Sequence, residues 1–252
     1  MRWLAFLFLT LLPVIAAAEE VVLGLSKDKV AITTSFDGSE ILIFGAVKRE
    51  SPIPEGSPLE VVITITGPSQ PVTVRRKSKW FGIWVNTASV DVDRAPSFYA
   101  VATTAPLSDV LSETEDLRHK VTIDRAIRSV GAPDNIENAA SFTDAVIRIR
   151  RNADLYQTLE SGIALDQQTL FRTAIKLPAN LTEGDYATRI FLTRDGQVVS
   201  SYETSIAVQK VGLERWLFAL SREQPFWYGL LSLAIAIAAG WGASAAFRLL
   251  RN

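Results

Sequence analysis

Alternating hydrophobic and polar residues dominate most of the chain. In residues 59–66, apolar side chains recur at every second position from Leu59 to Ile65, which is the period of a half-buried strand. Comparable short runs, separated by turn residues, lie at 40–47, 72–76, 81–86, 97–103, 169–177, 187–193 and 198–208. The pattern predicts a mainly β protein with an immunoglobulin-like β-sandwich. It leaves open whether residues 19–105 and 141–210 form one elaborated sandwich or two small ones.

The spacing of three residues in the last third of the chain supports a sandwich. Leu181, Gly184 and Tyr186 follow the spacing of a tyrosine corner, in which the phenol hydroxyl bonds to a nearby backbone carbonyl. We therefore expect the Tyr186 side chain to be tied to the chain just before it.

Apolar residues at helical spacing interrupt the strands in the middle of the chain. They recur as far as Leu117, while the acidic residues Glu113, Glu115 and Asp116 fall on the opposite side. Adjacent acidic residues in this pattern predict a solvated helix face rather than a paired-carboxylate catalytic site. We expect a helical connector over residues 106–140 and a second helix that begins at Ser141, where a capping pattern precedes apolar residues.

A long uncharged stretch near the C-terminus has the length of a membrane span. Residues 225–247 contain no charged side chain, and as a helix they would be about 35 Å long, which is enough to cross a bilayer core. Trp227 and Tyr228 at one end, and Arg248 and Arg251 beyond the other, suit the two membrane–water interfaces. The sequence predicts a transmembrane helix, preceded by a juxtamembrane segment at 211–224 and followed by a tail at 248–252.

The N-terminal residues 1–18 have the pattern of a secretory signal. A basic residue at Arg2 precedes an apolar run, and three alanines at Ala16, Ala17 and Ala18 form a small-residue cleavage site. We expect cleavage after Ala18, and an uncleaved N-terminal anchor remains the alternative.

Charge and cysteine content narrow the class of protein. The chain has no cysteine, which suits an exported bacterial domain that folds without disulfides. Between residues 19 and 224 there are 27 acidic and 23 basic residues, so this part carries no general attraction for nucleic acid. The prediction is a single-pass protein of the bacterial inner membrane, with its N-terminal domain in the periplasm and its tail in the cytoplasm.

Residues for catalysis or metal binding are few. His119 is the only histidine, and no nucleophile-elbow sequence accompanies it, so we expect a solvated loop histidine. With no cysteine and one histidine, the sequence indicates no metal site, and without a glycine-rich phosphate loop it indicates no cofactor. A hydrolase that uses His119 is therefore the third functional hypothesis, and no catalytic residue is assigned.

A cluster of cations and aromatic residues is the strongest candidate surface. Arg75, Arg76 and Lys79 lie beside Trp80 and Trp84, a combination that can bind an anionic ligand, lipid headgroups or a partner protein. The alternative is a hairpin with a basic edge, in which Trp80 and Trp84 share one strand face and fill the sandwich.

Small residues in the C-terminal helix form a second candidate surface. Ala239 and Ala243, and Gly242 and Ala246, form two small-xxx-small pairs, which allow close packing of helices in a membrane. The alternative is that alanine is simply common in such anchors.

The chain resembles an uncharacterised family of alphaproteobacterial transmembrane proteins. The resemblance rests on residues 79–86, 142–156, 170–178, 184–186 and 194–196, and on Tyr228-Gly229 and Gly240-Trp241 in the apolar helix. It implies an exported domain, a single C-terminal membrane helix and no established activity. It also implies a loose association with sulfite-exporter-type permeases, which suggests a transporter as a partner.

The leading functional prediction is a non-catalytic, membrane-anchored accessory or adaptor protein that engages another envelope protein through its sandwich surface. The alternative is a tethered periplasmic binding module for a small anion or an envelope polymer, centred on residues 75–84. The sequence determines neither the partner, nor the ligand, nor the oligomeric state.

Overall fold

The computed structural model of the chain describes residues 19–27, 29–32, 38–49, 56–129, 138, 140–210 and 213–250. Side chains are described for all of these except residues 210, 213–215, 219 and 246–250. The β-sheets and the helices between them form one compact unit that ends at Val208, and the two C-terminal helices belong to a second unit. The predicted signal segment, residues 1–18, lies outside the described residues.

The first layer of the fold is sheet A, an antiparallel sheet with the strand order β1-β3-β10-β9. Its strands are β1 (Glu20–Leu25), β3 (Ser39–Lys48), β9 (Ala164–Asp166) and β10 (Leu170–Leu177). Buried and exposed residues alternate along β10, so that Phe171, Ile175 and Leu177 point into the core. Sheet A therefore has one core face and one outer face.

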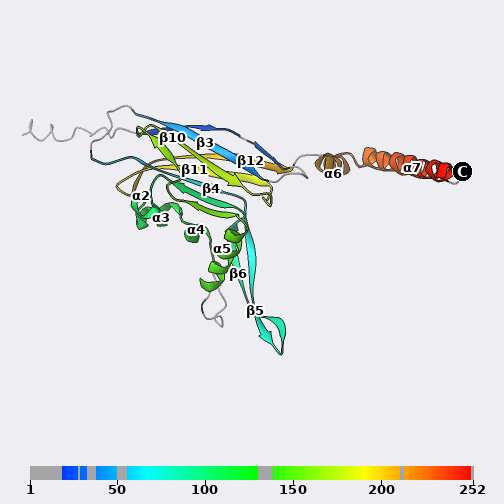
Figure 1. Ribbon diagram of the computed structural model, residues 1–252, viewed down its shortest axis with the longest axis horizontal. Helices are drawn as coiled ribbons and strands as arrows, with labels where there is room; N and C mark the ends of the chain where they lie inside the picture. Colours follow the sequence, from blue (N-terminus) through cyan, green and yellow to red (C-terminus); the bar gives the residue numbers. More distant parts are fainter. Residues whose placement is uncertain are drawn as a thin grey trace, which may run out of the picture. The chain divides into compact units, whose positions relative to one another are not determined.

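The second layer is sheet B, with the strand order β2-β12-β11-β4-β7-β8. Its strands are β2 (Lys29–Ile32), β4 (Glu60–Thr66), β7 (Tyr99–Thr103), β8 (Tyr156–Leu159), β11 (Gly184–Arg194) and β12 (Gln197–Lys210). The neighbouring pairs from β12 to β7 are antiparallel, while β7 and β8 are parallel. In β4, Ile63 and Val62 point to opposite faces and both are fully buried. Sheet B is thus covered on both sides, with sheet A stacked on one of them (Figure 1).

Four helices cover the other face of sheet B. They are α2 (Leu107–Val110), α3 (Glu113–His119), α4 (Ile123–Ala126) and α5 (Ala140–Asn152). Val62, Tyr99 and Phe191 of the sheet belong to one buried cluster with Val121 and Val146 from this helical region. The predicted connector over residues 106–140 is a set of short helices in its described part, because the backbone leaves the helical conformation at Leu111, Lys120 and Ile127. Lys120, for example, ends α3 in a left-handed conformation with a φ of 52°.

Buried tyrosines tie these layers together. The Tyr186 hydroxyl donates to the Thr182 carbonyl at 2.8 Å, which confirms the predicted tie to the preceding chain. The Tyr99 hydroxyl donates to the Val121 carbonyl at 2.9 Å, and the Tyr156 hydroxyl donates to the Pro96 carbonyl at 2.9 Å. Burial raises the pKa of Tyr99 and of Tyr156 to about 12, so both phenols stay protonated donors at neutral pH.

A long hairpin forms a separate two-stranded sheet. Strand β5 (Ser69–Trp80) pairs with β6 (Ile83–Pro96) along its whole length. Near the base of the hairpin, Val90 and Val92 are buried. Val92 belongs to the buried cluster that sheet B shares with the helical region. Figure 1 shows that the other end of β5 and β6 extends beyond the stacked sheets.

The second unit contains α6 (Leu213–Glu223) and α7 (Pro225–Leu250). Among the described residues, α7 is the helix that is long and apolar enough to cross a membrane, over Pro225–Ala245, and none of that stretch is buried by the rest of the chain. A helix that is apolar on all sides, and that the rest of the protein does not cover, is typical of a membrane span. The predicted single C-terminal apolar helix is confirmed.

The mainly β prediction is also confirmed, and the strands answer the question of how many sandwiches they build. Strands β1 and β3, from the first predicted half, pair within sheet A with β9 and β10, from the second half. Likewise, β4 pairs with β11 over the register Ile63↔Ile190. The two predicted halves therefore interleave in one pair of stacked sheets. Period-two patterns show where strands are, but strand partners depend on contacts between distant residues.

Candidate functional site

The hairpin between β5 and β6 turns at Phe81 and Gly82. Both residues have positive φ angles, 48° and 83°, as a two-residue type I′ turn requires. Asparagine followed by glycine is the usual choice for this turn, and a bulky side chain such as Phe81 is disfavoured at positive φ. The Phe81 side chain is therefore kept at a position where backbone conformation would favour another residue.

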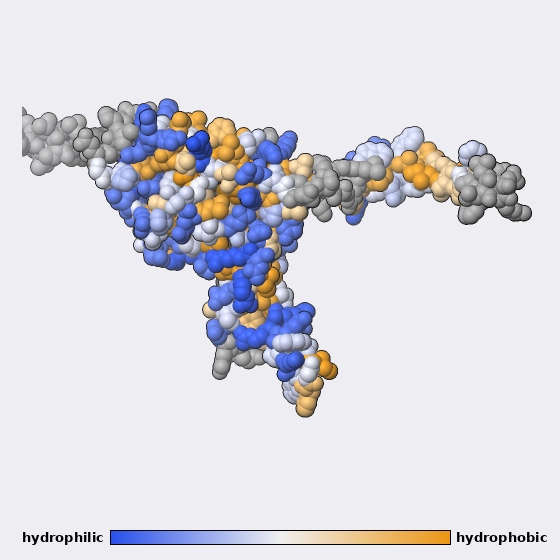
Figure 2. Space-filling model, viewed as in Figure 1, coloured by the Kyte–Doolittle hydropathy of each residue, from blue (hydrophilic) through white to orange (hydrophobic). Residues whose placement is uncertain are grey.

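Large apolar side chains at the end of the hairpin are exposed to solvent. Trp80, Ile83 and Trp84 are 65%, 68% and 64% exposed, and Phe81 is 95% exposed. These four residues are called the hairpin tip below. Figure 2 shows hydrophobic residues at the far end of the projecting hairpin, next to a hydrophilic band. The alternative that Trp80 and Trp84 fill the sandwich is wrong.

The turn explains why the face prediction failed for these tryptophans. A continuous strand would place Trp80 and Trp84 on one face, two positions apart on either side of Gly82. Because the chain reverses at Phe81 and Gly82, Trp80 instead pairs with Ile83, and Trp84 pairs with Lys79. Adjacent cross-strand pairs point to opposite faces of a ribbon, so the two tryptophans lie on different faces, and both are largely exposed among the described residues.

Cations lie behind the hairpin tip. Residues 75–86 hold four cations and no acidic residue. The ammonium nitrogen of Lys79 lies 5.9 Å from the ring centre of Trp84. Arg76 has another role: its guanidinium carbon lies 4.6 Å from the ring centre of Phe142, and its Nη2 donates to Ser141 Oγ at 2.6 Å. Arg76 therefore braces the hairpin against α5.

The hairpin thus brings together all the predicted surface residues, but in two groups. Lys79, Trp80 and Trp84 lie at or next to the tip, whereas Arg75 and Arg76 lie nearer the base. The sequence prediction did not single out Phe81 and Ile83, which are the two most exposed apolar side chains of the tip. The glycine after Phe81 was the available signal, because an isolated glycine within a strand pattern indicates an irregularity in the strand.

The outer face of sheet A exposes a second group of large apolar side chains. Val22, Leu42, Phe44 and Leu170 are between 43% and 56% exposed. Register places Val22 and Leu170 on either side of Ala46, so the apolar residues run across three neighbouring strands. Val22, Phe44 and Leu170 line an open groove of about 470 Å³, with Asp166 and Arg172 also in its lining, and Leu42 lies outside that lining. This surface is called the sheet A groove below.

Sequence reasoning missed the sheet A groove. Residues 41–47 are continuously apolar, which favours a strand buried on both faces. In the structure, Ile41, Ile43 and Val47 point inward and are buried, while Leu42 and Phe44 point outward and are exposed. The continuous run was the available signal that this strand has two apolar faces.

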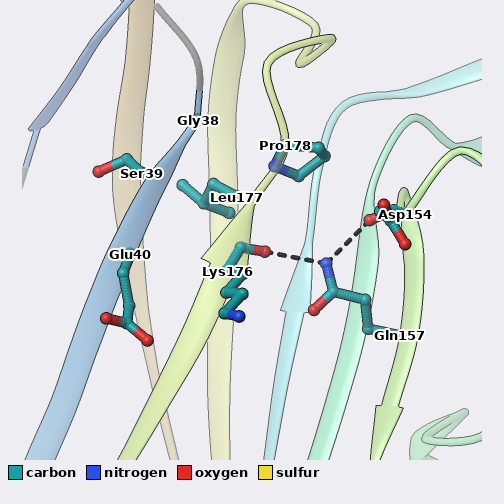
Figure 3. Close-up of a pocket in the computed structure, with 8 residues that line it drawn as sticks. All are labelled: Gly38, Ser39, Glu40, Asp154, Gln157, Lys176, Leu177 and Pro178. Atoms are coloured by element: carbon teal, nitrogen blue, oxygen red, sulfur yellow. Dashed lines mark hydrogen bonds between the residues drawn. The ribbon is translucent and has the colours of Figure 1, made fainter.

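A polar groove lies beside the ends of β3 and β10, with a volume of about 620 Å³ (Figure 3). Its lining residues are Gly38, Ser39, Glu40, Asp154, Gln157, Lys176, Leu177 and Pro178. The Gln157 amide donates to the backbone carbonyls of Asp154 and Lys176, at 2.8 and 2.9 Å. One hydrogen bond therefore ties β8 to β10, and the other ties Gln157 to the chain just before β8. Catalysis by a nucleophile and its base would need a pair in hydrogen-bond contact, and these eight residues form none.

Two of the three acidic residues of α3, Glu115 and Asp116, are buried, which corrects the solvated-face prediction for them, while the Glu113 side chain is exposed. Glu115 and Asp116 are 2% and 5% exposed, whereas Leu117 is 62% exposed. Asp116 accepts hydrogen bonds from the backbone N–H groups of Val121 and Thr122 at 3.0 and 2.7 Å. Its other carboxylate oxygen lies 2.7 Å from Arg125 Nε. These donors replace water around the carboxylate, so the acidic side of α3 can face inward.

His119 lies in the last turn of α3 and not in a solvated loop. Its Nε2 is 3.3 Å from Glu115 Oε2, and its ring centre is 5.1 Å from that of Phe191. Arg189 Nη1 donates to the His119 carbonyl at 2.7 Å. The histidine is therefore part of the packing between α3 and sheet B. Among the described residues, no group of three or more His, Asp or Glu side chains is placed to hold a metal ion.

The small residues of α7 contact no other part of the described chain closely. A Cβ added at Gly240 or Gly242 would meet no heavy atom within 4 Å. Ala239 and Ala243 are exposed, and the side chain of Ala246 lies outside the described part. Helix packing through these residues stays a prediction.

Comparison with known proteins identifies the family of the chain. No curated protein matches the chain. The family described as "Putative transmembrane protein (Alph_Pro_TM)" matches residues 20–249, which include both stacked sheets, the hairpin and the apolar helix. The chain belongs to this family of transmembrane proteins.

Proposed function

We propose that the protein is a non-catalytic accessory or adaptor protein of the bacterial inner membrane, which engages another envelope protein. Membership of a transmembrane family and the apolar helix α7 support attachment to a membrane. The proposed orientation puts the stacked sheets in the periplasm, as the signal-like residues 1–18 predict. We also propose that the sheets are an elaborated immunoglobulin-like sandwich, a proposal that the Tyr186 hydroxyl bond supports.

The sheet A groove is the observation that carries the adaptor proposal. An antiparallel sheet with one core face commonly has a polar outer face, but here that face exposes Val22, Leu42, Phe44 and Leu170. Contiguous exposed apolar residues mark protein–protein interaction sites. Asp166 and Arg172 in the lining can give the contact a polar rim with both charges. A partner protein that covers the groove would remove this apolar surface from water.

We propose an integral envelope protein as the partner, with transporters as the first class to test. A partner in the same membrane is held close to the anchored domain, which raises its effective concentration. The small-residue positions Ala239, Gly242, Ala243 and Ala246 in α7 would add a second contact within the membrane.

The binding-module alternative, centred on residues 75–84, has less support. Small-ligand sites are concave and bury most of the ligand, whereas these residues lie on a projecting two-stranded ribbon. Arg76 is already engaged by Ser141 and Phe142. The hydrolase hypothesis has less support still, because Glu115 and the ring of Phe191 contact His119 in the packing against sheet B.

The test is affinity purification of the full-length protein from membranes in mild detergent, followed by mass spectrometry. We expect a polytopic protein to co-purify with the natural chain and to be lost from the variant Leu170→Glu, because the new charge lies in the groove. Val199→Glu is the matched control, since Val199 is 48% exposed on β12, outside the groove. A third version carries an unrelated membrane helix in place of α7.

The outcomes separate the two contacts. Loss with Leu170→Glu alone places recognition on sheet A, and loss with the foreign helix alone places it in the membrane. The absence of any specific protein from the natural chain would contradict the adaptor proposal. Equal loss with Leu170→Glu and Val199→Glu would contradict a role for the groove.

A further inference from the structure

We propose that the hairpin tip inserts into the interfacial region of a lipid bilayer with anionic headgroups. The tip consists of Trp80, Phe81, Ile83 and Trp84, and the cations behind it would meet the lipid phosphates. The proposal concerns a different surface from the sheet A groove. It therefore stands or fails independently of the adaptor function.

The residues of the tip contribute little to the folding of the chain. All four side chains are more than half exposed, and Phe81 is almost completely exposed. The positive φ of Phe81 is a conformation that bulky side chains disfavour, so backbone preference does not explain the residue. Side chains that are exposed, apolar and disfavoured locally point to a function outside the fold. Tryptophan is also the residue type enriched at membrane–water interfaces.

The order of residues along the hairpin matches the depth profile of a bilayer surface. Strands rise about 3.3 Å per residue, so Lys79 lies about 3 Å behind Trp80 and Lys77 about 10 Å behind it. The headgroup region of one leaflet is about 5–8 Å thick, outside the hydrocarbon core. If the tip reaches the boundary between headgroups and acyl chains, Lys79 comes to lie within the headgroup region and Lys77 just outside it, next to the phosphates. The long lysine side chains can adjust this position by snorkelling.

Charge complementarity also favours an anionic lipid surface. The chain has a formal net charge of −1, yet residues 75–86 carry four cations and no acidic residue. The projecting end of the hairpin is therefore positive on a protein that is otherwise acidic. Juxtamembrane lysine and arginine residues are attracted to anionic leaflets, over a distance of about one Debye length.

The hairpin is braced from its base to its middle, so it presents the tip as a fixed element. Val92 is buried at the base, and Thr73 Oγ1 donates to Asp91 Oδ1 at 2.6 Å across the strands. Further out, Arg76 contacts Ser141 and Phe142 of α5. A two-stranded ribbon with no other support is only marginally stable in water. These contacts hold the tip ready without the ordering cost of a disordered loop.

A protein partner fits this surface less well than a bilayer does. Protein interfaces are depleted in lysine and enriched in arginine. In the hairpin, the cations nearest the tip are Lys77 and Lys79, while the Arg76 side chain is hydrogen-bonded to Ser141 of α5. The chain is also anchored in a membrane, so a lipid surface is always within its surroundings.

The test uses the absence of cysteine from the chain. The full-length variant Phe81→Cys is labelled with an environment-sensitive fluorophore and placed in phosphatidylcholine nanodiscs. Vesicles of phosphatidylcholine, with or without phosphatidylglycerol, are then added, and brominated lipid is placed either in the nanodisc or in the vesicles. We expect a blue-shifted emission that brominated lipid quenches, with more quenching when phosphatidylglycerol is present in the quenching membrane. To test this in the nanodisc as well as in the vesicles, a second set of nanodiscs contains phosphatidylglycerol.

The control label is placed at Val199→Cys, on the exposed surface of β12. It should show neither the blue shift nor the quenching. Replacing both Lys77 and Lys79 by glutamine should weaken binding to anionic vesicles about fivefold for each cation. Quenching from the nanodisc or from the vesicle supports insertion, and the arm that quenches identifies the membrane. Fluorescence that stays water-like for Phe81→Cys in every arm overturns the proposal.

A photoreactive residue at position 81 in native membranes decides between lipid and protein. A lipid adduct supports insertion, and a specific protein adduct overturns it. Neither result depends on whether a partner co-purifies through sheet A. Failure of the adaptor proposal therefore remains distinguishable from failure of this one.

Discussion

Strand β4 and the hairpin tip have similar hydrophobic character and opposite environments. In β4, Val61, Val62, Ile63 and Ile65 are completely buried, whereas the four tip residues are all more than half exposed. Strand β4 is hydrogen-bonded to β11 on one side and to β7 on the other, and it is covered by further layers on both faces. The tip residues pair only within the hairpin.

This difference separates apolar residues that stabilise the fold from apolar residues available for binding. Burial of a large aliphatic side chain contributes about 1.5–3 kcal/mol, and this stabilisation requires neighbours on every side. A two-stranded ribbon supplies one neighbouring strand and no covering layer. The apolar residues of the tip thus remain available to a surface outside the chain, and the same holds in part for the sheet A groove.

The same substitution in the two regions should have very different effects on stability. Ile63→Ala removes a fully buried side chain from β4, and we expect it to lower the free energy of unfolding by about 2–5 kcal/mol. Ile83→Ala, at a 68% exposed position, should change it by less than about 0.5 kcal/mol. Denaturant unfolding of the full-length protein in detergent, followed by near-UV circular dichroism, measures both. Similar losses from the two variants would contradict the comparison.

A partly buried and an exposed ion pair extend the comparison to charged residues. Glu19 is 12% exposed and lies 2.7 Å from Arg49 Nε and from Arg194 Nη2. Glu20 lies 3.7 Å from Lys48 Nζ in a pair that is mostly exposed. We expect Glu19→Gln to cost about 1.5–3 kcal/mol, because charge-assisted hydrogen bonds are lost, and Glu20→Gln to cost less than about 1 kcal/mol.

The Glu19 pair also predicts a dependence of stability on pH. Burial raises the pKa of Glu19, but the hydrogen bonds and positive charges of Arg194 and Arg49 outweigh this effect and hold it below the ordinary value of 4.5. The stabilisation is therefore complete above the unfolded pKa and is lost as the pH falls through the lower folded pKa. Unfolding measured from neutral to acidic pH should show this loss for the natural chain and less of it for Glu19→Gln. An identical acid profile for the two proteins would contradict it.

A small, local gain in stability is expected at the turn. Phe81→Asn places a residue that tolerates positive φ in the type I′ turn, and we expect it to stabilise the hairpin by up to about 1 kcal/mol. Hydrogen exchange of the amides in β5 and β6 measures this local stability. Faster exchange in the variant would show that Phe81 stabilises the hairpin, and would contradict the expectation that it lowers the stability of the turn.

Much of the architecture could be predicted from local patterns. The alternation in residues 59–66 predicted a strand, and β4 spans Glu60–Thr66. The uncharged run at 225–247 predicted the helix that the structure shows as α7. The spacing up to Tyr186 predicted its hydroxyl bond to the chain just before it. Each of these features depends on residues close together in the sequence.

The positions of the candidate surfaces could not be predicted in the same way. The faces of Trp80 and Trp84 depended on the turn at Phe81, which reverses the alternation. The inward side of α3 depended on donors from Val121 and Thr122, which make the burial of Asp116 possible. The exposure of Phe44 depended on sheet A having no layer of described residues over its outer face.

The sequence by itself therefore determined that this is a mainly β protein with an apolar C-terminal helix, because residue period and uninterrupted hydrophobicity act locally. Only the tertiary structure decided which apolar residues are core and which are surface. That decision rests on contacts between residues far apart in the chain, such as Ile63 with Ile190 across β4 and β11. Among the described residues, the strands at the hairpin tip pair only with each other, so an apolar sequence that would be core elsewhere remains exposed.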